Sequence, residues 1–159
     1  MRNLVRTLFR PSPAVVERAK RGQALVEFSL AIIPFLVLLM GVIDLGRGIY
    51  TMNGTSEAAR EITRVTIVHL KDGSGNIGFS TETTDTIATQ VGLVPGLTIN
   101  ATTDIACVDE YDAVVADKDC RPGSDFIRVH VSAPFAPITP IVSMFGSHTF
   151  ESTSRMQIP

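Results

Sequence analysis

Residues 28–43 form an uninterrupted apolar run, FSLAIIPFLVLLMGVI, without a charged side chain. As a helix this run is about 24 Å long, and residues 24–46 reach about 34 Å, enough to cross the roughly 30 Å hydrocarbon core of a bilayer. The longer segment includes Glu27 and Asp44. A core helix of a soluble domain would be amphipathic, whereas this run is apolar on every face. We therefore predict a membrane-spanning helix over residues 23–46.

A cleaved secretory signal is the rival interpretation of the same run. Such a signal ends its apolar stretch in a small-x-small site such as A-x-A. Here the run leads instead into Asp44-Leu45-Gly46-Arg47, which is a poor cleavage site of that kind. The sequence therefore favours a helix that is retained in the mature protein.

The charge distribution predicts how this helix is oriented. Residues 1–22 carry a net charge of +5, and the rest of the chain carries −7. Because basic residues are retained on the cytoplasmic side, we expect the basic segment 1–22 to lie in the cytoplasm and everything after residue 46 to be extracytoplasmic. The predicted location is therefore the cell (inner) membrane, with a single pass and contact with membrane lipid. Nucleic acid is not expected as a partner, because no basic surface survives beyond residues 1–22.

The two cysteines are consistent with an oxidising compartment. Cys107 and Cys120 lie in a polar, acidic stretch with twelve residues between them. A disulfide would close a loop there and stabilise the fold by about 3 kcal/mol in the chain-entropy estimate. Two unrelated thiols are the alternative, whereas a zinc site would need more ligands than these.

The helix is expected to extend well beyond the membrane. Ser12-Pro13 is a natural cap and first-turn pair, and no strong stop appears before residues 72–75, Asp-Gly-Ser-Gly. Pro34 should kink the helix inside the membrane. Residues 47–70 then form an amphipathic extension, whose predicted apolar stripe is Ala58, Ile62, Val65 and His69.

The sequence pattern predicts a small extracytoplasmic α+β domain over residues 71–159. After a linker at 71–82 we expect a short helix from 84 or 85 to 94, a strand at 97–108, a solvated acidic loop to about 124, and a strand at 126–131. A Pro-rich crossover follows, with a helical turn or two at 141–145, and then a last strand at 148–158. The predicted fold is α+β, with one long N-terminal helix followed by a small antiparallel sheet of about three strands. Since about 90 residues make a thin core, the sheet should pack against the long helix or a partner.

No catalytic constellation is evident in the sequence. The three histidines, His69, His130 and His148, are scattered and match no metal-ligand spacing. The acidic residues of 104–125 do not have the spacing of an EF-hand calcium loop. No phosphate-binding loop or nucleophile elbow occurs. We therefore predict that the protein is not an enzyme and carries no cofactor or metal.

The stretch most informative about function is residues 22–28, Gly-Gln-Ala-Leu-Val-Glu-Phe. Gly22 follows the basic segment, Glu27 lies five residues further on, and Phe28 opens the apolar run. A Glu at the edge of a membrane helix is costly and usually functional, although an interfacial Glu that reaches back to the cytoplasmic surface is the simpler alternative.

This stretch resembles the processing site of type IV prepilins, and the wider sequence is similar to the TadE-like family of the tight-adherence (Flp) pilus system. Residues 41–47, Gly-Val-Ile-Asp-Leu-Gly-Arg, resemble the end of that family's membrane helix. Residues 58–64, Ala-Ala-Arg-Glu-Ile-Thr-Arg, resemble its next helical motif, with Ile62-Thr63 in place of the usual small pair. The strand at 127–131, followed by Pro134-Phe135, a Pro-rich turn and a final strand, is also similar.

The resemblance implies a minor pilin or pseudopilin whose leader is cut after Gly22 by a prepilin peptidase. Gly22, Gln23, Glu27 and Phe28 are then the processing residues, and Glu27, Asp44 and Arg47 act in assembly or helix packing. Glu27 lies one helical turn from Gln23, so its carboxylate can neutralise the new α-amine of Gln23 on its own or a neighbouring chain.

The implied partners are other pilus subunits and the inner-membrane assembly platform. Two other classes of function are open: an uncleaved single-pass protein with an outer ligand-binding or interaction domain, and a membrane-anchored hydrolase, for which no constellation is found.

Overall fold

The computed structural model describes residues 13–71, 75–139, 144 and 146–159, and the side chains from residue 22 onward within these ranges. The chain divides into two compact units, Met1–Val42 and Ile43–Pro159. The first helix, α1, runs from Pro13 to Val68 and contributes to both units. Its first residue is the predicted one, while the capping role proposed for Ser12 lies outside the described residues.

In the first unit, the helix has no buried side chain among its described residues. Most large apolar side chains of residues 25–42 are between 45% and 74% exposed, while Ile32 and Val37 are partly buried. Among the described residues, one helical segment, Gly22–Val68, is long and apolar enough to cross a membrane. Pro34 lies inside this helix, and the kink expected there stays a prediction. The described residues of this unit leave most of this apolar surface uncovered, and such a surface is more stable in an apolar environment than in water.

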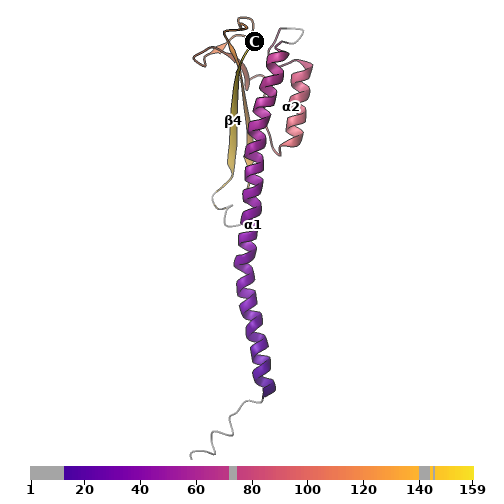
Figure 1. The fold of residues 1–159 in the computed structure, drawn as a ribbon, viewed down its shortest axis with the longest axis vertical. Helices are drawn as coiled ribbons and strands as arrows, with labels where there is room; N and C mark the ends of the chain where they lie inside the picture. The colour runs from indigo at the N-terminus through magenta and orange to yellow at the C-terminus, as the bar shows by residue number, and fades with distance from the viewer. Residues whose placement is uncertain (1–12, 72–74, 140–143, 145) are drawn as a thin grey trace, which may run out of the picture. The chain divides into compact units, whose positions relative to one another are not determined.

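The second unit combines the outer part of α1 with a second helix and a sheet. Helix α2 spans Thr81–Leu93. The strands are β1 (Ile105–Val108), β2 (Val114–Val115), β3 (Phe126–Phe135) and β4 (His148–Gln157). They form one antiparallel sheet in the order β2-β1-β3-β4. Figure 1 shows α2 alongside α1, as the contact of Gly54 with Val94 requires. The predicted α+β layout is confirmed, with four strands rather than about three.

Strand β3 supplies the centre of the core. Its side chains alternate as predicted, and Ile127, Val129, Val131 and Ala133 are fully buried. They belong to one apolar cluster with Ala58, Ala59 and Ile62 of α1. The expectation that the sheet packs against the long helix is therefore confirmed. The predicted inward face of β4 is also confirmed, since Ser154 is buried and the neighbouring residues on the same face are partly buried.

Threonines occupy much of the α1 face that meets the sheet. Thr51, Thr55, Thr63 and Thr66 are buried, and each hydroxyl donates to the carbonyl four residues earlier, at 2.6–3.0 Å. This bond satisfies the hydroxyl within the helix and leaves the methyl group free to pack. The predicted stripe was therefore right at Ala58 and Ile62 but wrong at His69, which is exposed.

Two predicted element boundaries were wrong because polar side chains bond the backbone locally. Helix α2 begins at Thr81, earlier than expected, because Ser80 caps it by accepting the Thr83 amide at 3.2 Å. The strand expected at 97–108 is reduced to β1. Asn100 opens a turn instead, with its side-chain oxygen accepting the Thr102 amide and its carbonyl accepting the Asp104 amide.

The strand expected at 126–131 extends to Phe135 and includes Pro134. On this strand, His130 and Ser132 donate their amides toward the β1 side. Pro134 has the same parity but lies beyond the end of β1, so its missing N–H costs no bond of the ladder. The last strand agrees with the prediction to within one residue. The helical turns expected at 141–145 fall almost wholly outside the described residues.

The close approach of α2 to α1 depends on Gly54. A Cβ atom at this position would lie 2.8 Å from a methyl group of Val94, the stiff, buried residue that ends α2. We predict that Gly54→Leu lowers the free energy of unfolding by about 1–3 kcal/mol, the usual cost of overpacking. Thermal unfolding of the full chain in detergent micelles, followed by circular dichroism, measures this.

The matched control for that substitution is Gly92→Ala. Gly92 is also helical, but a Cβ there meets no atom within 4 Å. The control should therefore keep or raise the unfolding temperature, since Ala is the better helix former. Equal unfolding temperatures for Gly54→Leu and the unmodified chain would contradict the proposed contact.

Candidate functional site

The segment that resembles a processing site lies on the exposed first unit of α1. The Gln23 side-chain amide donates to the Glu27 carboxylate at 3.0 Å, one helical turn apart, and both side chains are exposed. Phe28 is 63% exposed. A Cβ atom on Gly22 would meet no described atom within 4 Å. Packing within the described chain therefore gives no reason for a glycine at position 22.

Asp44 lies where the apolar run ends, yet only 5% of it is exposed. Its carboxylate accepts the backbone amide of Ile138, at 3.0 Å from each oxygen, and the amide of Thr139 at 2.7 Å. Arg47 adds an ion pair at 3.1 Å. One carboxylate thus fixes the Pro-rich segment after β3 to the helix; we call this set of contacts the Asp44 tether.

Aromatic contacts extend the tether along the helix. The Arg47 guanidinium lies 5.5 Å from the centre of the Phe135 ring, and that ring is 5.7 Å from the ring of Phe150. A Cβ at Gly48 would stand 3.7 Å from the Phe135 ring. The sequence singled out Asp44 and Arg47 but not their partners, because residues 138 and 139 contribute backbone amides, which leave no trace in side-chain patterns. The role in assembly or helix packing assigned to Asp44 and Arg47 stays a prediction.

The residues of the third family-like motif, 58–64, lie on two faces of α1, one buried and one exposed. Ala58 and Ala59 are fully buried against the sheet, where only small side chains let the helix approach closely. On the exposed side, Arg64 donates two hydrogen bonds to Glu61, at 2.9 and 2.6 Å. The small residues of this motif therefore have a packing reason within the chain.

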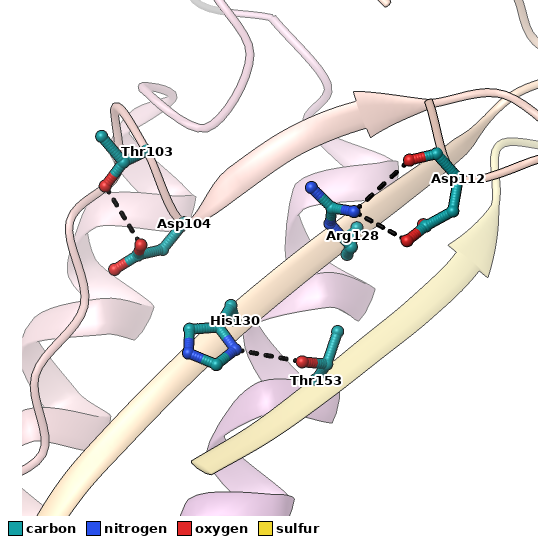
Figure 2. Close-up of a pocket in the computed structure, with 6 residues that line it drawn as sticks. All are labelled: Thr103, Asp104, Asp112, Arg128, His130 and Thr153. Atoms are coloured by element: carbon teal, nitrogen blue, oxygen red, sulfur yellow. Dashed lines mark hydrogen bonds and ion pairs between the residues drawn. The ribbon is translucent and has the colours of Figure 1, made fainter. Parts of the chain in front are cut away.

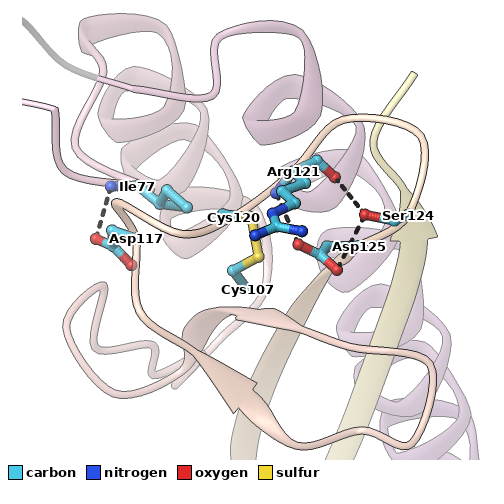
Figure 3. The surroundings of a disulfide bond; sticks show 7 residues. All are labelled: Ile77, Cys107, Asp117, Cys120, Arg121, Ser124 and Asp125. Carbon is cyan, nitrogen blue, oxygen red and sulfur yellow. Dashed lines mark hydrogen bonds between the residues drawn. A yellow bond between two sulfur atoms is a disulfide. The ribbon is translucent and has the colours of Figure 1, made fainter.

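Cys107 and Cys120 form a disulfide, with both residues buried (Figure 3). Asp125 lies near the two sulfurs, and these three residues have the proximity of a metal site. The sulfurs are bonded to each other, however, and the Asp125 carboxylate accepts the Arg121 amide at 2.7 Å. Asp117, in the same loop, accepts the Ile77 amide at 3.0 Å. These groups stabilise the loop and are not free ligands.

The acidic loop is more ordered than the solvated loop expected from sequence. Arg128 and Arg155 lie opposite each other on β3 and β4. Arg128 pairs with Asp112 at 2.7 Å, and Arg155 donates to the carbonyls of Asp109 and Glu110. The loop carbonyls and carboxylate offset the repulsion between the two guanidinium groups. Both arginines can be identified in the sequence. That both bind the same loop, residues 109–112, follows only from the strand register that places them opposite each other.

A surface pocket of about 370 Å³ lies on the side of the sheet that carries Arg128 and His130 (Figure 2). Its polar groups pair with one another: Arg128 with Asp112, His130 Nδ1 with the Thr153 hydroxyl at 3.0 Å, and Thr103 with Asp104 at 3.0 Å. The pocket contains both hydrogen-bond donors and hydrogen-bond acceptors. Binding a ligand there would require these internal pairs to be shared or broken.

The Asp44 tether yields a local prediction. In Asp44→Ala the amides of Ile138 and Thr139 lose their acceptor, at a cost of about 1–3 kcal/mol for each buried group left unsatisfied. Amide hydrogen exchange at these two positions should accelerate, and Glu57→Ala, which changes an exposed acid on the same helix, should leave it unchanged. Unaltered protection in Asp44→Ala would contradict the tether.

Comparison with known proteins gives one match. A family model described as TadE-like protein matches residues 22–64, from Gly22 to the end of the Ala58–Arg64 motif. A search of curated proteins found no match, and neither did a search of solved structures. The matched segment contains all three helical motifs on which the resemblance was based. The predicted resemblance to the TadE-like family is therefore confirmed over residues 22–64.

Proposed function

We propose that this chain is a minor pilin or pseudopilin that helps to initiate or assemble a tight-adherence (Flp-type) pilus, after removal of a leader that ends at Gly22. The family match suggests a role in tight-adherence pilus systems, and the single apolar helix fits a single-pass membrane protein. One observation carries the finer proposal. The match begins at Gly22 and includes residues 25–42, whose large apolar side chains are mostly exposed in the described chain.

The proposed processing step gives Glu27 its role. In the uncleaved chain, Glu27 accepts a hydrogen bond from the Gln23 side chain at 3.0 Å. Cleavage after Gly22 converts the Gln23 backbone nitrogen into an ammonium group one helical turn away from that carboxylate. An ammonium and a carboxylate that neutralise each other cost less to bury than either does alone. Pairing within one chain or between neighbours therefore lets processed helices associate in one axial register.

The proposed arrangement places the basic leader in the cytoplasm, where a prepilin peptidase cuts it, and the outer domain across the membrane. The excess of Lys and Arg before the helix and the disulfide beyond it support this orientation. The exposed apolar face of residues 25–42 would contact lipid before assembly and other pilus subunits, or the assembly platform, afterwards.

An uncleaved single-pass protein with an outer binding domain is the second candidate. The polar pocket beside Arg128 and His130 is the observation that favours it. The two candidates differ in the mature N-terminus, which is Gln23 for the pilin-like subunit and Met1 for the anchored binding protein. Intact mass of the purified protein separates them.

Processing should depend on the small size of residue 22. We predict that Gly22→Leu blocks removal of the leader, because a bulky side chain should not fit a peptidase site that accepts glycine. Gly41→Leu is the matched control: it is also a helical glycine with open space around it, and it should leave cleavage intact. Intact mass of both variants, made in cells that contain the peptidase, checks this. A Gly22→Leu chain that still begins at Gln23 would refute the assignment of the site.

Assembly should depend on the charge of Glu27. In Glu27→Gln the new ammonium group of Gln23 is left unpaired as helices associate, which costs about 3–5 kcal/mol when such a pair is buried. We expect normal insertion and cleavage but about a hundredfold less fibre, or less co-purification with other pilus subunits. Glu57→Gln, on the exposed side of α1, is the control. Wild-type assembly of cleaved Glu27→Gln would eliminate the charge pairing and favour the anchored binding protein.

A further inference from the structure

The Asp44 tether lies within, and not beyond, the exposed apolar surface of α1. After Asp44, Leu45 is 65% exposed, Ile49 is 52% exposed and Met52 is 57% exposed. Apolar side chains that face outward thus continue for two further turns of the helix. If α1 spans a bilayer, the level of Asp44 belongs to the apolar or interfacial layer. A carboxylate there must be paired, and this one is almost completely covered by its partners.

The segment that covers Asp44 has the properties of backbone held at membrane depth. Irregular backbone is tolerated there only where its N–H and C=O groups find partners. Within residues 136–139, Pro137 has no N–H group, and Asp44 accepts the amides of Ile138 and Thr139. The sequence has no Asp, Glu, Lys or Arg between Arg128 and Glu151. The segment is thus freed of charges and has few N–H donors to satisfy.

The position of the segment follows from its bonds to Asp44. The Asp44 carboxylate accepts the Ile138 amide at 3.0 Å from each of its oxygens, and Asp44 lies at the end of the apolar run. Ile138 is therefore held beside Asp44, at about the same level of α1. Its side chain is 64% exposed, which is unfavourable in water and favourable in lipid.

We propose that residues 136–139 form a second membrane contact, seated in the outer interfacial layer of the bilayer beside α1 with the Ile138 side chain in lipid. The surface is continuous with the membrane-spanning segment, and its partner is the lipid bilayer. Asp44 has two roles in this arrangement: it satisfies the amides of the segment and sets its depth. The outer domain is then fixed to the membrane at two points, which restricts its rotation about the helix axis.

The absence of tryptophan from the chain provides a direct test. Ile138→Trp introduces a single fluorophore into the full-length protein, reconstituted in phosphatidylcholine–phosphatidylglycerol vesicles. Its emission should be quenched by lipids brominated near the glycerol end of the acyl chain, to about the extent seen for Leu45→Trp. It should be protected from aqueous iodide. Tyr111→Trp, in the acidic loop and 87% exposed in the parent chain, should show the opposite behaviour.

A second variant separates fixed placement from insertion driven by tryptophan itself. Adding Asp44→Ala to Ile138→Trp should reduce quenching by brominated lipid and raise quenching by iodide, whereas adding Asp112→Ala should change neither. Iodide quenching of Ile138→Trp at the level of Tyr111→Trp would overturn the proposal, as would lipid quenching that is insensitive to Asp44→Ala.

A smaller probe covers the case in which tryptophan disturbs the fold. Ile138→Cys can be labelled selectively with a nitroxide because both native cysteines are in the disulfide. Its spin relaxation should respond more to oxygen, which concentrates in lipid, than to a water-soluble nickel chelate; the reverse order would overturn the proposal. The inference depends on α1 lying in a bilayer and not on cleavage, so its failure would leave the proposed pilin function untouched.

Discussion

The unit formed by Ile43–Pro159 depends on the mutual burial of β3 and the part of α1 that lies in this unit. Ile127, Val129 and Val131 are fully buried and share one apolar cluster with Ala58, Ala59 and Ile62, so α1 supplies part of the apolar surface that covers them. The helix supplies that surface with alanines and threonines, which are small enough to let the backbone approach the sheet. A domain of this size buries a modest fraction of its surface, so the helix is part of the core.

The polar groups of the domain follow from the same packing. On the inner side, each buried threonine of α1 bonds a carbonyl of its own helix, so that no hydroxyl is left unsatisfied in the contact with the sheet. On the outer side, Arg128 and Arg155 hold the loop that contains Asp109 and Asp112. The disulfide between Cys107 and Cys120 ties the far end of this loop to β1. The acidic residues thus act mainly as hydrogen-bond acceptors for the fold.

The two acidic side chains of the membrane segment are handled in different ways. Glu27 is exposed and accepts a hydrogen bond from the Gln23 side chain. Asp44 is covered, and the chain itself supplies its donors. On this contrast rest our proposals that Glu27 acts in assembly and that Asp44 positions the segment after β3.

The sequence by itself determined the elements whose signal is local. The charge-free run at 28–43, with no strong stop before residues 72–75, predicted the long helix α1. Strict alternation of apolar and polar residues predicted the buried face of β3. The family motifs, read along one helix, predicted the TadE-like match. Only the tertiary structure decided what the backbone contributes: the amides of Ile138 and Thr139 on Asp44, the Asn100 turn that shortens β1, and the loop held by Arg128 and Arg155. Main-chain donors and acceptors are the same in every residue except proline, so no pattern of side chains can reveal which of them will meet across the fold.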